Sequence, residues 1–213
     1  MKAKSTFPNQ VDNRSVREEI LFKSMALLRV NALLVFIVFA TGCLDVQYKD
    51  YEFILNPDGT WRGTITYRNI ISRSEDDKDA SETDFQQLIN DYYLGNALVE
   101  DNHQFENIEK DLYIKNDTLI GKMTFTFHSI DSMGFYKDKN SEYSSYFFYD
   151  GTLKESLMKT NGEYLGKKRD FPLIKWGGEE THFTFSTASN QNMDDAVSLV
   201  NQYREWKTKP SKE

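Results

Sequence analysis

The sequence predicts an α+β fold, a mostly antiparallel sheet built from hairpins, with two amphipathic helices packed on one face. Three observations lead to this prediction. Segments of alternating apolar and polar residues follow one another, turn dipeptides separate them, and apolar residues recur at helical spacing in two places. The 213 residues are enough for one domain, and the aromatic content of 14 % supplies core volume.

The first hairpin is predicted on residues 50–67. Apolar and polar residues alternate on both sides of the tetrapeptide Asn56-Pro57-Asp58-Gly59. Proline presets φ and glycine accepts a positive φ, so this tetrapeptide predicts a tight turn. One face of the two strands carries Tyr51, Phe53, Leu55, Trp61, Gly63, Ile65 and Tyr67.

Further strands extend the sheet to six to eight members. A second hairpin is predicted from 112–114 and 118–127, joined by a turn at 115–117. A third is predicted from 143–149 and 152–157, joined at Asp150-Gly151, and Asn161-Gly162 predicts another tight turn. Residues 172–176 and 181–187 again have strand character.

Two segments predict helices. Ser81 to Asp84 is typical of a helix start, and Gly95 of a helix end. The second helix is expected from Asn192 to Trp206, with a frayed tail at 208–213, so a single α+β domain spans 50–207. The expected apolar stripes are Phe85, Leu88, Ile89 and Tyr92 in the first helix, and Ala196, Leu199, Val200, Tyr203 and Trp206 in the second.

The first 42 residues have the features of a secretory signal peptide. Arg29 gives a positive flank, an apolar run covers 30–40, and the small residues Ala40, Thr41 and Gly42 come before Cys43. The run is shorter than the roughly 20 residues that cross a bilayer core. Because residues 1–24 are polar and mixed in charge, we expect translation to start at Met25 and 1–24 not to be translated.

The tetrad Ala40-Thr41-Gly42-Cys43 resembles the lipobox of bacterial lipoproteins. The resemblance implies cleavage before Cys43, a diacylglycerol on its sulfur, and residues 43–49 as lipid anchor and short tether. Palmitate-type chains would then hold the protein on a membrane. Leu44 in place of aspartate after the cysteine implies the outer membrane. The alternative is that Cys43, the only cysteine, is a core thiol and 30–40 a core helix.

Charge and motifs exclude several classes of function. The net charge is −7. Removing the six basic and three acidic residues of 1–42 leaves 20 against 30, or −10, so a nucleic-acid partner is not expected. No motif for a cofactor or a metal is present. Glu180 and His182 share a strand face, and the acidic residues of 75–79 lack calcium-loop spacing; both are interpreted as solvated surface.

The aromatic segment 143–149 is the main candidate for ligand binding. If one strand face lines a groove, Tyr146 and Phe148 would bind an apolar or sugar-like ligand. If both faces are covered, the segment is core, which is the favoured interpretation.

Residues 54–67, read with Cys43, resemble the lipid-anchored α+β proteins of Bacteroidota-type envelopes, and the hairpin is similar to that of LppM-like lipoproteins, a lipid-binding family. Three hypotheses follow. The first is a non-catalytic envelope module that binds an apolar ligand or an envelope protein partner. The second is a structural or assembly lipoprotein without a small ligand, and the third is a hydrolase of unfamiliar type using Glu180, His182 or an acidic pair.

Overall fold

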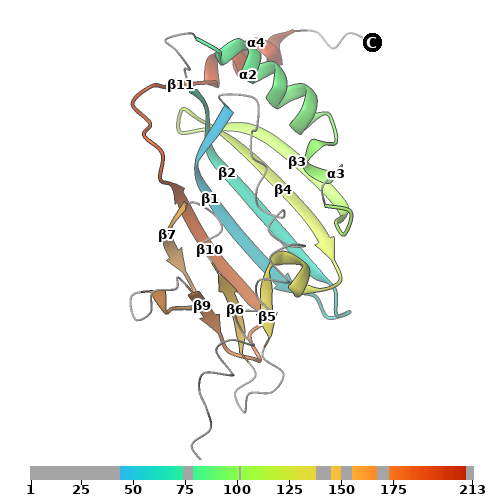
Figure 1. Ribbon diagram of the computed structural model, residues 1–213. Helices are drawn as coiled ribbons and strands as arrows, with labels where there is room; N and C mark the ends of the chain where they lie inside the picture. Colours follow the sequence, from blue (N-terminus) through green and yellow to red (C-terminus); the bar gives the residue numbers. More distant parts are fainter. Residues whose placement is uncertain are drawn as a thin grey trace, which may run out of the picture.

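The computed structural model describes six stretches of the chain (Figure 1). The predicted α+β class is confirmed, because antiparallel sheet dominates and a few helices accompany it. The predicted signal peptide and Cys43 lie outside the described residues, as do most of the acidic segment 75–79 and the side chains of residues 147 and 149. The described stretches are 44–73, 79–100, 102–137, 145–149, 155–166 and 173–209.

The larger sheet has seven antiparallel strands. Their order is β3-β4-β2-β1-β10-β7, and β11 pairs with the end of β2. The strands are β1 (Leu44–Leu55), β2 (Trp61–Arg73), β3 (Glu106–Lys115), β4 (Thr118–Phe127), β7 (Glu155–Thr160), β10 (His182–Ser189) and β11 (Ala196–Ser198).

The smaller sheet has four antiparallel strands in the order β5-β6-β9-β8, and a short 3₁₀ helix precedes it. It shares a core with the strands of the larger sheet near the β1–β2 turn. The elements are η2 (Ile130–Met133), β5 (Phe135–Lys137), β6 (Tyr146–Tyr149), β8 (Glu163–Tyr164) and β9 (Leu173–Trp176).

The first and last helices lie across the opposite end of the larger sheet, where β1 begins, and the short helix at Ala97–Glu100 lies further along the sheet, beside β3 (Figure 1). Two buried side-chain contacts attach them. Ser72 Oγ in β2 donates to Asp84 Oδ2 at 2.5 Å, and the Tyr203 hydroxyl donates to the carbonyl oxygen of Leu112 in β3. The helices are α2 (Ser81–Gln87), the π-helix η1 (Leu88–Tyr93), α3 (Ala97–Glu100) and α4 (Val200–Thr208).

Turn chemistry explains the first two hairpins. The β1–β2 turn uses Gly59 at φ 86°, and the Asp58 carboxylate accepts from the backbone N–H of Thr60 at 2.9 Å. The β3–β4 turn has Asn116 and Asp117 at φ 52° and 55°, the positive values that a two-residue type I′ turn needs. Both hairpins were predicted, although β3 starts six residues earlier than expected.

A kink at Asn69 keeps one face of β1 and β2 covered along their whole length. Asn69 has φ 59°, and its side-chain amide donates to Gln47 Oε1 at 2.8 Å. The alternation of buried positions restarts there, so Tyr67 and Ile70 both face the helical cluster. Without the kink, one half of each strand would expose its apolar side chains.

Three expectations were wrong. Residues 44–49 are not a tether, because they form the first half of β1 and Leu44 is only 2 % exposed. The predicted third hairpin does not exist, since β6 pairs with β5 and β9 while β7 pairs with β10 in the other sheet. The last helix begins at Val200, because 196–198 pair with β2 as strand β11.

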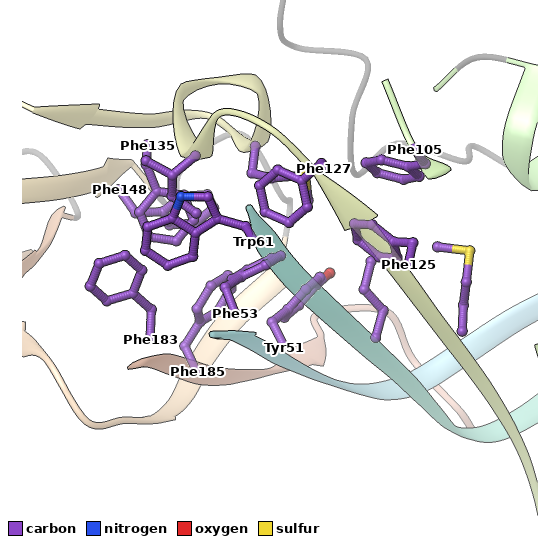
Figure 2. Close-up of a cluster of buried hydrophobic side chains, with 14 of the residues drawn as sticks. Tyr51, Phe53, Trp61, Phe105, Phe125, Phe127, Phe135, Phe148, Phe183 and Phe185 are labelled. Atoms are coloured by element: carbon purple, nitrogen blue, oxygen red, sulfur yellow. The ribbon is translucent and has the colours of Figure 1, made fainter. Parts of the chain in front are cut away.

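Two clusters of buried side chains lie on the face of the larger sheet that the smaller sheet and the helices cover. The aromatic cluster lies between the two sheets, and Figure 2 shows its rings packed around Phe53 and Trp61. The helical cluster lies between the larger sheet and the helices. It contains Leu44, Val46, Ile70, Phe85, Leu88, Ile89, Leu112, Leu119, Leu199, Val200 and Tyr203.

Candidate functional site

A cavity of about 70 Å³ lies where the two buried clusters meet. We call it the seam cavity. The sheet forms its floor, and η1 and α3 form its roof. The apolar side chains that line it include Val46, Ile65, Ile70, Leu88, Leu98, Leu112 and Met123.

The floor consists of two neighbouring rows of residues that run across the strands. The register places Lys110, Met123 and Ile65 in one row. It places Leu112, Gly121, Tyr67 and Lys49 in the next. A lysine therefore lies toward each end of the floor, one in β3 and one in β1. Three strand spacings separate those strands, or about 14 Å.

Gly121 lies in the middle of the floor, and because it has no side chain, it leaves space there. It lies opposite Tyr67 in β2 and Leu112 in β3. A Cβ atom at this position would lie 3.1 Å from Ile70 Cδ1, which is a tight contact. A larger side chain here would fill part of the cavity.

Most of the roof is the π-helix η1. π-helices are rare in proteins overall, but those that occur are often found at functional sites. Leu88, Tyr92 and Tyr93 of η1 reach the cavity, and Leu98 of α3 completes the roof. Gly95 follows the end of η1. Only glycine fits at this position, because a Cβ atom there would lie 2.3 Å from the carbonyl oxygen of Asn90. The predicted helix end at Gly95 is thus close to the observed one.

Lys110 closes the β3 end of the cavity. Its Nζ donates to the carbonyl oxygens of Tyr92 and Gly95, at 2.9 and 2.5 Å. A cation at the C-terminal end of a helix offsets the partial negative charge of the free carbonyls. Burial lowers the pKa of Lys110, because the low-dielectric surroundings disfavour its charged form.

The β1 end carries a second polar group on the covered face. Lys49 Nζ contacts Glu155 Oε1 at 2.5 Å, and both side chains are mostly buried. The other oxygen of Glu155 accepts from the hydroxyl of Thr187. Burial first, and then the negative charge of Glu155, raise the pKa of Tyr51 and of Tyr67, so both phenols stay neutral.

The size and lining of the cavity define what it accepts. Its volume is well below the roughly 300 Å³ at which drug-sized pockets begin and about half of the roughly 150 Å³ that holds one benzene molecule, so it encloses only part of an alkyl chain and the rest lies in its open mouth. The walls are mostly apolar and favour hydrocarbon. Lys110 and Lys122 outnumber Asp111 among the charged residues of the lining on the β3–β4 side, so an anion is favoured there. The arrangement therefore suits a slender alkyl chain that carries a negatively charged group.

The groove at Tyr146 and Phe148 stays a prediction, and the structure places both side chains among other aromatic rings. Phe148 is 4 % exposed and packs on Phe135 and Phe185 at ring distances of 5.1 and 4.8 Å. Tyr146 packs on Trp61 and Phe183, and its ring accepts Lys137 Nζ at 4.5 Å from the centroid.

Glu180 and His182 are not brought together as a reactive pair. His182 Nε2 instead lies 2.9 Å from Glu52 Oε1 in β1, on the exposed face of the sheet. That face also holds a shallow polar hollow of about 270 Å³, lined by Asp50, Thr64, Thr66, Lys159 and Ser186 among others. Tyr51 and Phe185 also line it, but it is shallow and open to solvent, so it would cover little of a ligand's surface.

Sequence reasoning did not find the seam cavity. Its lining comes from β1, β2, β3, β4, η1 and α3, and no short motif contains more than a few of these residues. The one local signal was Gly121, a glycine inside an otherwise regular alternating strand.

Other features add no second site. Among the described residues, no three His, Cys, Asp or Glu side chains gather in a metal-binding arrangement. None of the helices in the described part of the chain combines the length and the apolar character needed to cross a membrane. Comparisons with protein-family models, with curated proteins and with solved structures find no match.

Proposed function

We propose that this chain is a lipid-anchored protein of the bacterial cell envelope, attached through Cys43, and that its domain binds a small apolar ligand without changing it chemically. The outer membrane is the expected location. The anchor is supported by the lipobox-like tetrad 40–43 and by the apolar run before it.

The seam cavity is the observation that supports ligand binding. It is a mostly apolar pocket, partly open to solvent, at the junction of two clusters whose side chains are otherwise closely packed. Apolar cavities of this kind bind apolar molecules when the ligand fits. The Lys110 ammonium at the β3 end gives the ligand a direction, with its anionic group toward β3.

The exposed surface favours ligand binding over a purely structural role for the domain. A structural or assembly protein is expected to show a contiguous apolar patch. The large exposed apolar side chains among the described residues are instead single ones on separate segments, namely Leu94, Tyr136 and Met158.

The binding test uses octanoate and 1-octanol in isothermal titration calorimetry. We expect octanoate to bind at one saturable site, and hexanoate to bind more weakly because each CH₂ contributes about 0.8 kcal/mol. Gly121→Val, which fills the floor, should weaken octanoate binding at least tenfold. Lys110→Met should weaken octanoate binding but not octanol binding.

Thr124→Val is the matched control, because Thr124 lies in the same strand at a position outside the cavity lining. It should bind octanoate as the wild type does. Binding that is absent in the wild type, or unchanged by Gly121→Val, would rule out the seam cavity as the ligand site.

The anchor is tested separately. The chain is expressed in a bacterial host with labelled palmitate, beside a Cys43→Ser variant. We expect label and membrane retention in the wild type and neither in the variant. An unlabelled wild type would contradict the proposed lipid attachment. The ligand-binding proposal would then depend on the calorimetry alone.

A further inference from the structure

The described part of the domain starts at Leu44, the residue after the predicted lipid-bearing cysteine. Leu44 is buried, its backbone pairs with Ser72, and it belongs to the helical cluster. Consecutive Cα atoms lie about 3.8 Å apart, so no linker residues separate Cys43 from the first described residue of β1. A flexible linker would instead let the domain move by about 5–6 Å times the square root of its length.

Three elements surround this end of β1. Asp45 Oδ2 lies 3.2 Å from Arg73 Nε at the end of β2, and Val197 of β11 pairs with Ser72. Helix α4 lies across the same end of the sheet, and its Val200 and Tyr203 share the helical cluster with Leu44 (Figure 1).

We infer that this end of the domain, formed by the start of β1, β11 and α4, rests on the lipid surface in the lipidated protein. The inference depends on the proposed anchor at Cys43. It adds an orientation: the β1–β2 turn and the smaller sheet point away from the membrane, and the helical roof of the seam cavity lies nearer to it.

The chemistry of α4 fits a lipid headgroup surface. Lys207 and Lys209 are exposed, and Lys207 Nζ lies 5.6 Å from the ring centroid of Trp206. Arg204 is already paired with Asp117 at 2.8 Å. Tryptophan and lysine are enriched where proteins meet the headgroup layer, because each has an apolar part and a polar tip.

The three tryptophans of the chain measure the orientation. Trp206 lies in α4, whereas Trp61 and Trp176 are buried in the aromatic cluster. Trp61 pairs with Leu55, eleven residues along β1 from Leu44, which is about 36 Å of strand. A quencher in the lipid layer therefore distinguishes the two ends of the domain.

The experiment uses the full chain expressed in a bacterial host and purified from its membranes. Mass spectrometry first establishes the lipid on Cys43. The protein is then reconstituted into phosphatidylcholine vesicles whose acyl chains are brominated near the headgroup. We expect quenching of the Trp206 emission, at least a twofold loss, and no quenching in Trp206→Phe, whose remaining tryptophans are distant.

A linker variant provides the second arm. Twelve Gly and Ser residues inserted between Cys43 and Leu44 should keep the lipid and reduce the Trp206 quenching at least twofold. If Trp206→Phe does not fold, slower hydrogen exchange of α4 amides on vesicles than in detergent replaces it as the expected result.

The outcomes separate the two proposals. A protein without lipid on Cys43 overturns both the anchor and the orientation. A lipid-bearing protein whose Trp206 is not quenched, or whose quenching is the same with the linker, overturns the orientation alone. Quenching of Trp61 and Trp176 in the Trp206→Phe variant would mean that the opposite end of the domain faces the membrane.

Discussion

The two halves of the covered sheet face are packed by different kinds of side chain. Among the described buried residues, 11 of the 17 in the aromatic cluster are Phe, Tyr or Trp, against two of the 11 in the helical cluster. Broad rings from two facing sheets interlock, whereas aliphatic side chains under short helices leave a cavity at the junction. One sheet thus carries a closely packed aromatic end and, next to it, a helix-covered end with a pocket at the junction.

Phe183→Ala should have the largest effect on stability. Phe183 is completely buried, and its ring lies within 5.3 Å of the rings of Trp61, Phe135, Tyr146 and Trp176. We expect a loss of about 4 to 5 kcal/mol in the free energy of unfolding, from lost transfer energy plus the cavity. Urea denaturation with an unchanged m-value measures it.

Leu119→Ala is the matched substitution in the helical cluster, since Leu119 is also completely buried. We expect about 3 kcal/mol, because the neighbouring aliphatic side chains relax into the space more easily. A loss equal to or larger than that of Phe183→Ala would contradict the idea that the aromatic end is the more rigid one.

Lys49→Met should have the next largest effect. Among the described residues, it leaves the Glu155 carboxylate, whose side chain is 10 % exposed, with the Thr187 hydroxyl as its one remaining partner. Removing one partner of a buried ion pair costs about 3 kcal/mol, because the other charge stays desolvated. The double variant Lys49→Met/Glu155→Leu should recover most of this loss in a double-mutant cycle.

Arg68→Met is the control on the exposed face of the same sheet, where Arg68 of β2 pairs with Asp50 of β1. It breaks the pair of Arg68 with Asp50 at 2.6 Å, where both side chains are about two-fifths exposed. We expect a loss of less than about 1 kcal/mol. Equal losses for the two single variants would mean that the Lys49–Glu155 pair is no more buried in solution than the exposed pair.

The parts of the fold that the sequence predicted correctly are those with a local cause. The β1–β2 and β3–β4 hairpins were predicted because Pro57, Gly59, Asn116 and Asp117 specify their turns. The partners of β6 and β7 were not predictable, because pairing in separate sheets depends on contacts with β9 and β10 far along the chain.

The candidate site was missed for the same reason. Lys49 and Glu155 are 106 positions apart, and only the folded sheet places them together. Residues 196–198 were predicted as helix because their apolar spacing continues that of α4, yet hydrogen bonding to the end of β2 makes them a strand. Tertiary contacts decided both cases.

Tyr51→Phe should have the smallest effect and the opposite sign. The Tyr51 hydroxyl is buried beside Thr187, which lowers the pKa of Tyr51 against the larger effect of burial, but among the described residues it makes no hydrogen bond of standard geometry. A buried polar group without a partner costs about 1 to 3 kcal/mol, so its removal should stabilise the protein by about 1 kcal/mol. Thermal unfolding at pH 7 measures this gain, and Tyr136→Phe, at an exposed position, should change stability by less than about 0.5 kcal/mol.

The same substitution should change the response to alkaline pH. Because the pKa of the Tyr51 phenol is raised in the folded state, the neutral form is favoured there, and its contribution is fully present below the unfolded value of about 10. That contribution is lost as the pH rises above about 10, so the wild type should lose stability between pH 10 and 11. Tyr51→Phe should lose less, while Tyr67, whose pKa is raised in the same direction, keeps part of the slope. A Tyr51→Phe variant that is less stable than the wild type at pH 7 would instead show that the Tyr51 hydroxyl forms a hydrogen bond with Thr187. The Tyr51 hydroxyl would then belong to the polar cluster of Lys49, Glu155 and Thr187.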